Sequence, residues 1–363
     1  MSKIDFEIIS KAPARICLFG DHQDYLNLPV IACTINRYIE IKASPNNSNF
    51  FKIYKTDLNQ IDIIEFRDPL IKIQGEDYLR LALKVVKRYG CNPNKGYDIY
   101  ISGDIPINAG LSSSSALTIA WIQFLISIFK ASEPLSSSFI SRLAYEAEVI
   151  EQDSSGGKMD QYAISNGRTI YLNPSNDKID FITTPIEHLV VGVSGESKDT
   201  LGMLSFLKSK SWEAIHKVQS VIPEFDPKNV RIEKIPSYLN IVGEKLKPFL
   251  EASILNYMIT QKAKHELKKD VIEKSIIGKL MTQHHLLLKE NLRITTPKID
   301  LMIEASLNSG AYGAKIVGSG GGGCIVAIAN KKNIDQIITN IKKVGAQDAF
   351  SVSISKGPSI SLN

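Results

Sequence analysis

The sequence has few cysteines and no apolar run long enough to cross a membrane. Its four cysteines lie far apart in 363 residues, without the C-x-x-C spacing of a zinc site or the density of a disulfide scaffold. We expect buried thiols in a reducing cytoplasm. The longest apolar segment spans only residues 117–129, and the first residues carry charges where a signal peptide has an apolar core. These features predict a soluble, cytoplasmic protein that does not bind a membrane.

Neither sign of charge dominates the chain. Lysine and arginine number 43 against 38 aspartates and glutamates, which gives a formal net charge of +5, and the basic residues are scattered. Nucleic-acid-binding domains carry a basic stripe instead, so no nucleic-acid partner is expected. The length suits two domains, for which we expect residues 1–183 and 184–363. A monomer and a homodimer are both compatible with these features.

The most informative stretch joins an apolar strand to an apolar helix through glycine and serine. Residues 97–102 are typical of a strand, and residues 114–129 are apolar nearly all round, as in a buried helix. Between them, four successive serines follow a glycine and a leucine. Their hydroxyls can cap the free amides of the helix, and those amides with the helix dipole attract an anion such as phosphate. Capping alone explains an isolated serine run, so the neighbouring motifs must decide.

Polar residues follow the first expected strand directly. That strand covers residues 4–19 and contains Arg15, and Asp21, His22 and Asp24 come immediately after it. Two carboxylates beside an imidazole can bind a metal or grip the hydroxyls of a polyol. A solvated loop is the simpler explanation for such a cluster on its own.

Two further acids lie near a glycine-rich loop. Glu148 falls at the edge of the apolar stripe of an expected helix over residues 139–151, where a carboxylate is costly unless it is paired or bound to a cation. Asp160 follows Gly157-Lys158, which is not a phosphate-binding Walker A loop because methionine comes next and the upstream glycine is missing.

The second half is mostly helical over residues 199–292 and ends in a glycine-rich turn. Residues 318–323 formally match G-x-G-x-x-G, but a strand rather than a helix follows, so we expect a β-hairpin whose turn approaches a ligand. A helix near residues 334–341 and a last strand near residues 350–354 complete this half. His284 and His285 are adjacent on a helix, which predicts one packed and one exposed ring.

Taken together, three motifs resemble the GHMP kinase superfamily and, within it, the galactokinase-like sugar kinases. They are Ala12-Pro13-Ala14-Arg15 with Gly20-Asp21-His22-Gln23-Asp24-Tyr25, then Pro106-x-x-x-Gly-Leu-Ser-Ser-Ser, then Gly313 to Cys324. The resemblance implies a two-domain α+β fold, in which the N-terminal domain has a left-handed βαβ unit and the C-terminal domain is ferredoxin-like.

The resemblance also implies ATP and Mg²⁺ as cofactors and a role for each site residue. Asp160 would be the base or orienting group for the acceptor hydroxyl, and Arg15 the cation near the γ-phosphate. Mg²⁺, a hard cation, would take oxygen ligands from Ser114 and Glu148. The acceptor would contact Asp21, His22, Asp24 and Tyr25. ATP would be bound by Gly110, Leu111, Ser112, Ser113, Ser114, Ser115, Gly318, Gly320 and Gly321.

The acceptor is less well defined than the reaction. The Asp24 carboxylate can accept from two vicinal hydroxyls, which favours a sugar, phosphorylated on its anomeric hydroxyl as the resemblance implies. Asp21 stands where galactokinases usually have glutamate, and residues 195–212 lack the aromatic and arginine pattern that galactokinases carry there. The sequence therefore does not identify the sugar. Residues 280–288 suit a mevalonate kinase. A non-catalytic sensor of ATP and sugar is a third hypothesis, against which the presence of Asp160 argues.

Overall fold

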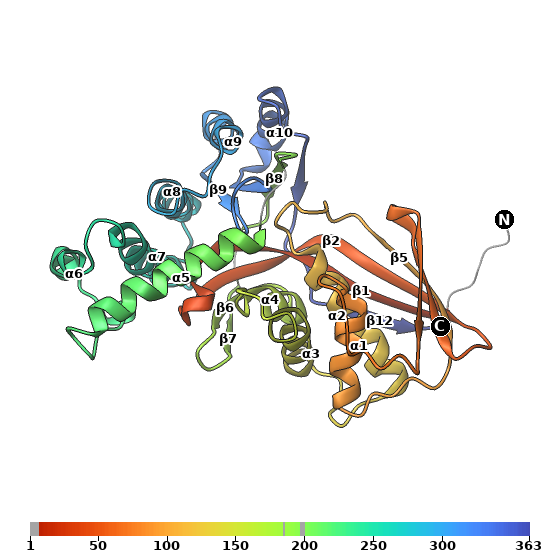
Figure 1. The fold of residues 1–363 in the computed structure, drawn as a ribbon. Helices are drawn as coiled ribbons and strands as arrows, with labels where there is room; N and C mark the ends of the chain where they lie inside the picture. The colour runs from red at the N-terminus through yellow and green to blue at the C-terminus, as the bar shows by residue number, and fades with distance from the viewer. Residues whose placement is uncertain (1–6, 184–185, 197–199) are drawn as a thin grey trace.

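The computed structural model describes residues 7–183, 186–196 and 200–363, which form two β-sheets with helices packed against them (Figure 1). The predicted domain boundary, between residues 183 and 184, borders on residues outside the described part. The division into 1–183 and 184–363 therefore stays a prediction. No helix of the described residues is long and apolar enough to span a membrane.

The larger sheet has eight strands and contains both ends of the described chain. Its order is β12-β1-β2-β5-β3-β4, and β6 pairs with β2 and β7. The β3–β5 pair is parallel and the other pairs are antiparallel. The strands are β1 Ile8–Phe19, β2 Val30–Pro45, β3 Phe50–Lys55, β4 Gln60–Glu65, β5 Tyr97–Gly103, β6 Thr169–Asn173, β7 Lys178–Phe181 and β12 Ser359–Leu362.

Four helices lie together beside this sheet (Figure 1). They are α1 Tyr78–Arg88, α2 Ser113–Phe129, α3 Ser137–Tyr145 and α4 Met159–Asn166. Helix α2 is the central one, and its rings Trp121 and Phe124 pack on Phe51 of β3 in a fully buried aromatic cluster. The uniformly apolar sequence of α2 is thus explained by burial on all sides.

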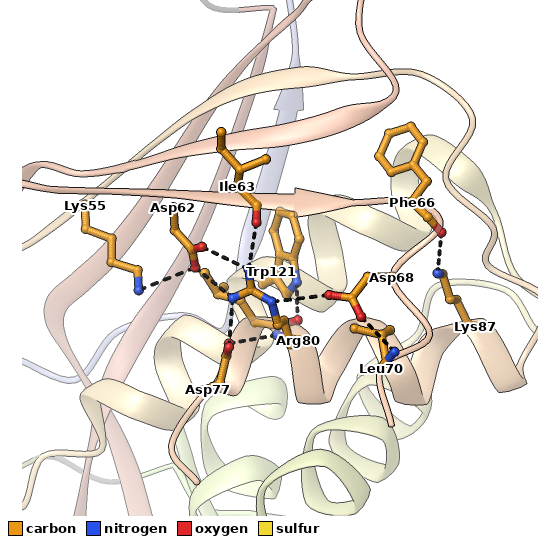
Figure 2. A network of polar contacts seen from close by, with 11 residues as sticks. Lys55, Asp62, Ile63, Phe66, Asp68, Leu70, Asp77, Arg80, Lys87 and Trp121 are labelled. Atoms are coloured by element: carbon orange, nitrogen blue, oxygen red, sulfur yellow. Dashed lines mark hydrogen bonds and ion pairs between the residues drawn. The ribbon is translucent and has the colours of Figure 1, made fainter. Parts of the chain in front are cut away.

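Figure 2 shows how α1 is tied to the edge strand β4. Nη1 and Nη2 of Arg80 each donate to an oxygen of Asp62 at 2.9 Å, and Nη2 also donates to the carbonyl oxygen of Ile63 at 2.7 Å. Asp77 caps the helix through the amide of Arg80 and also binds its guanidinium. A planar guanidinium suits such a fork of carboxylates. The network holds the first turn of α1 in place.

The second sheet has four antiparallel strands in the order β11-β8-β10-β9. In chain order this is 4-1-3-2, with α9 and α10 in the two crossovers, which is the predicted ferredoxin-like arrangement. The elements are β8 Leu189–Val193, α9 Pro297–Asn308, β9 Gly313–Val317, β10 Cys324–Ile328, α10 Ile334–Lys343 and β11 Asp348–Val352.

Further helices are inserted between β8 and α9. They are α5 Thr200–Gln219, α6 Ile235–Val242, α7 Lys247–Leu267 and α8 Lys274–Glu290. Figure 1 shows them at the end of the molecule away from β12. Short 3-10 turns are found at Asp24–Leu26, Thr56–Leu58, Pro227–Asn229, Ile232–Lys234 and Lys331–Asn333.

The predicted order of elements is largely confirmed, with four differences. The expected helix 139–151 ends at Tyr145 and continues as a π-helical turn, Glu146–Ile150. Strands β6 and β7 and the single continuous helix α5 were not predicted either. Strand β12 was not predicted. All four cysteines are buried, as expected, and no disulfide joins any of them in the described part of the chain. The hand of the crossover from β3 to β5 stays a prediction.

Candidate active site

Arg15 and Asp160 form the centre of the site. Strand β1 carries Arg15, which is 4% exposed, and Asp160 lies in the first turn of α4. Nε and Nη2 of Arg15 donate to the two oxygens of Asp160 at 2.7 and 2.6 Å, and Nη1 donates to the carbonyl oxygen of Gly110 at 2.6 Å. One guanidinium therefore joins the predicted base to the glycine of the serine loop.

The serine loop, Gly110 to Ser115, differs in detail from the predicted cap. Ser112 precedes α2 in a left-handed conformation with φ of 59°, and its side chain caps no amide of the helix. Its hydroxyl instead donates to Oδ2 of Asp160. The capping role expected for this serine is thus wrong, because its left-handed backbone differs from the extended one of an N-cap and does not place the hydroxyl oxygen to accept from those amides. The first amides of α2 receive no bond from Ser112 and can hold an anion.

Glu148 lies in the π-helical turn that follows α3 and is 8% exposed. Its oxygens accept from the hydroxyls of Ser115 at 2.7 Å and Thr118 at 3.2 Å, and from Nε2 of Gln161 at 2.5 Å. All three donors are neutral. Burial raises the pKa of Glu148 to about 7, against these hydrogen bonds, which favour the ionised form. A cation bound at this carboxylate would remove the cost of its ionisation.

Ser114 lies near the same carboxylate. Burial, and next the charge of Glu148, raise the pKa of Tyr78 to about 12, and a hydrogen bond with the Ser114 side chain acts in the opposite direction. Tyr78, the first residue of α1, is therefore within interaction range of both predicted metal ligands. A hydroxyl and a carboxylate oxygen around one position form a donor set that suits Mg²⁺. The residues present therefore fit the predicted metal.

Asp24 connects the loop after β1 to the start of α4. Its Oδ2 accepts from the amide of Met159 at 3.1 Å, next to Asp160. Burial raises the pKa of Asp24 to about 6, and the charge of Asp160 acts in the same direction. Gly157 leaves the space for this carboxylate, since a Cβ there would lie 2.0 Å from Oδ2. The predicted acceptor residue is therefore close to the predicted base.

The carboxylate of Asp21 is bound by groups of the chain instead of facing the predicted substrate. Its Oδ2 accepts from Nζ of Lys315 at 2.6 Å, and its Oδ1 accepts from the amide of Gly318 at 3.2 Å. The residue is 2% exposed. Since groups of the chain occupy both oxygens, the structure favours a structural role over the predicted contact with an acceptor.

His22 and Tyr25, the other predicted acceptor residues, are neighbours in the same loop. Nδ1 of His22 lies 3.2 Å from the hydroxyl of Tyr25, and both residues are buried. Burial lowers the pKa of His22 to about 4, so the ring is neutral. Its Nε2 is buried and has no hydrogen-bond partner among the described residues. A polar group of a ligand would satisfy it.

The glycine-rich turn 318–323 closes on the serine loop. It joins β9 to β10 in the predicted hairpin. Gly318, Gly320 and Gly321 have φ of 87°, 84° and 72°, a region that favours glycine. A Cβ on Gly318 would lie 3.0 Å from Cα of Gly110, so the two loops touch backbone to backbone. The expected approach of this turn to the site is therefore present in the structure, whereas nucleotide contacts of its glycines stay predictions.

Sequence reasoning missed the groups that hold these side chains. Lys315 binds Asp21, Gln161 binds Glu148, and both are buried. His284 and His285 are also both buried, so the prediction of one exposed ring is wrong. Helix α8 packs between α7 and β9, and this covers more of its surface than one face. The lysine at position 315, within an apolar strand, was the one sequence feature that could have indicated such contacts.

Comparison with known proteins agrees with this arrangement. Residues 77–168 match the family model of the GHMP kinases N terminal domain and residues 268–347 that of GHMP kinases C terminal. Residues 3–45 match the galactokinase galactose-binding signature. These three segments include Arg15, the serine loop, Glu148, Asp160 and the glycine-rich turn.

Relatives of two activities align over nearly the whole chain. A galactokinase of Actinobacillus succinogenes is 27% identical over 94% of this chain and 91% of its own length. A mevalonate kinase of Thermococcus gammatolerans is 27% identical over 93% of both. Among solved structures, Lactococcus lactis galactokinase complexed with galactose superimposes with a TM-score of 0.88 at 21% identity, covering 97% of this chain and 95% of its own. With both GHMP kinase domain models matched in order around this site, the chain belongs to the GHMP kinase superfamily.

Proposed function

We propose that the chain is an ATP-dependent sugar kinase of the galactokinase-like kind, which transfers the γ-phosphate of ATP to a sugar hydroxyl. The observation that carries the proposal is the junction of Arg15, Asp160 and Gly110. It joins a carboxylate able to act on a hydroxyl to a cation and to the loop before α2, whose first amides receive no bond from Ser112. Phosphoryl transfer depends on positioning and charge neutralisation, which this junction supplies.

The phosphate side is formed by the start of α2. The amides after Ser112 and the positive end of the helix dipole would hold the phosphates. Ser114 and Glu148 would hold Mg²⁺, which neutralises the charge that develops on the transferred group. Arg15 would lie near the γ-phosphate, because its guanidinium contacts both Gly110 and Asp160.

The acceptor side is formed by the loop after β1 and by Asp160. The acceptor oxygen forms a bond to the γ-phosphorus, the bond from that phosphorus to the bridging β–γ oxygen breaks, and ADP leaves. The hydroxyl proton passes to Asp160, whose Oδ1 accepts only from Nε of Arg15 among the described residues. Asp24 and His22 would bind other hydroxyls of the sugar and hold the reacting one toward Asp160.

A sugar is favoured by the match of residues 3–45 to the galactose-binding signature and by Asp24 beside the predicted base. The sugar is otherwise open, as is the hydroxyl that is phosphorylated. A mevalonate kinase is the second candidate, because relatives with that name align as fully as galactokinases do.

One screen tests the proposal and separates the candidates. Purified protein with Mg-ATP is assayed by coupled ADP release with galactose, other hexoses, uronic acids, pentoses, heptose phosphates and mevalonate. We expect turnover with a sugar. Turnover with mevalonate alone would replace the proposal by the second candidate. Absence of ADP with every acceptor, while ATP still binds, would indicate a sensor of ATP and sugar.

A further inference from the structure

Lys315 is the most deeply buried charge in the described part of the chain. It lies in the middle of β9, a strand of the second sheet, and is 0% exposed. Its Nζ donates to Oδ2 of Asp21 at 2.6 Å and to the carbonyl oxygen of Cys17 at 3.0 Å. Both partners belong to β1 or to the loop that follows it. A single ammonium group therefore connects the two sheets.

Asp21 extends this connection to two further segments. Its Oδ1 accepts from the amide of Gly318, which is the first residue of the glycine-rich turn. Its carbonyl oxygen accepts from Nδ2 of Asn256 on α7 at 2.8 Å. A buried carboxylate that kept only one of these partners would destabilise the folded protein. Removing Lys315 would therefore also weaken the other hydrogen bonds of Asp21. The position of the loop after β1 thus depends on Lys315.

The residues held in this way are those of the acceptor side. His22 is next to Asp21, and backbone groups of Gly318 and Ser319 lie near its ring. Asp24 is three residues along, where its carboxylate meets the start of α4. The contacts of the phosphate side are different, because Glu148 is bonded by Ser115, Thr118 and Gln161. Lys315 therefore acts chiefly on the acceptor half of the site.

We propose that Lys315 is a positioning residue for the acceptor: through Asp21 it holds His22 and Asp24 in register with the glycine-rich turn and Asp160. This inference rests on the proposed function, since it names what positions the acceptor in the same site. Lys315 itself is fully covered by the chain and touches no acceptor. Its effect on an acceptor is exerted through the loop.

The kinetic test compares Lys315→Met with Lys315→Arg, using the sugar that the screen identifies. We expect Lys315→Met to raise the KM for the sugar by about tenfold or more, since small misplacements of a bound reactant have large effects, and to raise the KM for ATP several-fold less, since of the predicted nucleotide contacts only those of the glycine-rich turn follow Lys315 on the chain. Lys315→Arg keeps the charge and should restore part of the difference. Equal changes in both KM values, or no change, would overturn the proposal.

A matched control is Lys264→Met. Nζ of Lys264 on α7 forms an ion pair at 2.9 Å with Asp180 of β7, so it also joins the inserted helices to the first sheet, but away from Asp21. This variant should leave the ratio of the two KM values unchanged. If it shifted the ratio as Lys315→Met does, the effect would be one of general destabilisation and the proposal would fail.

Hydrogen exchange tests the inference without relying on turnover. In Lys315→Met, amides of residues 20–27 and 318–323 should exchange faster, while those of α2 keep their protection. Unchanged exchange in both loops would overturn the proposal even if the protein is active. If no acceptor yields ADP, the proposed function fails, but this measurement still decides whether Lys315 holds the loops. Should Lys315→Met not fold, Asp21→Asn and Lys315→Arg are measured in the same way.

Discussion

The guanidinium of Arg15 meets the carboxylate of Asp160 through two parallel hydrogen bonds, from Nε at 2.7 Å and from Nη2 at 2.6 Å. This bidentate geometry fixes the plane of the carboxylate as well as its position. The third bond of Arg15, to Gly110, sets the same guanidinium against the serine loop. The predicted base and the predicted phosphate site are therefore oriented by one side chain.

Replacing Asp160 by Asn should separate catalysis from nucleotide binding. The amide oxygen of Asn can still accept from Arg15, but the side chain cannot take a proton from the acceptor hydroxyl. We expect turnover to fall by about a hundredfold or more, the usual scale for loss of a general base. Affinity for Mg-ATP, measured by calorimetry, should stay nearly unchanged. Near-normal turnover would show that Asp160 only orients the hydroxyl.

A single methyl group at residue 157 should disturb the acceptor side. A Cβ on Gly157 would lie 2.0 Å from Oδ2 of Asp24, so Gly157→Ala must turn this carboxylate away and break its bond to Met159. We expect the KM for the sugar to rise by about tenfold or more and the KM for ATP to change little.

Gly156→Ala is the matched control for Gly157→Ala. Its Cβ would lie 3.6 Å from Cγ2 of Val149 and 3.8 Å from Oγ of Ser154, which are ordinary contacts. Near wild-type kinetics are expected for this variant. A similar rise of the KM for the sugar in both variants would mean that the effect comes from a stiffer loop and not from displacement of the Asp24 carboxylate.

The site residues could be predicted from the sequence because they lie in short motifs. Arg15, the serine loop and Asp160 follow from local chemistry and from the resemblance. Their partners could not be predicted in this way. The pair of Asp21 and Lys315 joins residues 294 positions apart, and neither flanking segment indicates the other. From the sequence, Asp21 was therefore expected to contact the acceptor, whereas in the structure a buried lysine binds its carboxylate.

The secondary structure, too, could be predicted from the sequence only where the local pattern determines it. Helix α2 and strand β8 are continuous apolar runs that can be identified locally. Strand β12 is short and polar on one side, and it is a strand because it pairs with residues Ile8–Lys11 of β1 at the other end of the chain. The π-helical turn at Glu148 likewise departs from the helical pattern, where the carboxylate is bonded by Ser115 of α2.

The pKa of Glu148 predicts a pH dependence of stability. Burial raises this pKa from its ordinary value of 4.5 to about 7, so between these values the folded protein binds a proton that the unfolded chain has lost. The free energy of unfolding therefore falls as pH rises through this window and levels off above about 7. A tenfold difference in proton affinity between the folded and unfolded states corresponds to about 1.4 kcal/mol.

Glu148→Gln should remove this contribution. In urea unfolding of the ligand-free protein at pH 4.5, 6 and 8, the variant should gain stability relative to the wild type as pH rises. Buried histidines titrate in both proteins, so only the difference between the two curves is interpreted. Mg-ATP should stabilise the wild type more than the variant. If the free energy of unfolding changed with pH in the same way in both proteins, Glu148 would not be a buried carboxylate with a raised pKa.

His284 should have the opposite effect on stability. The ring is 0% exposed, neither of its nitrogens has a hydrogen-bond partner among the described residues, and burial lowers its pKa to about 3. The charge of Lys315 lowers this pKa further, whereas Asp21, whose Oδ2 lies 4.0 Å from Nε2, raises it. The unfolded chain therefore binds the proton more tightly between about pH 3 and 6.5. The free energy of unfolding falls as pH falls through this window.

His284→Phe should make the protein less sensitive to acid. A phenyl ring keeps the stacking on Phe19, whose centroid lies 6.2 Å away, and it needs no hydrogen bonds. Between pH 7 and 5 the variant should lose about 2 kcal/mol less stability than the wild type, as measured by urea unfolding. His265→Phe, at an exposed position of α7, should follow the wild-type curve. Equal acid sensitivity of the wild type and His284→Phe would mean that this ring is protonated in the folded protein, with Asp21 rather than Lys315 dominating its surroundings.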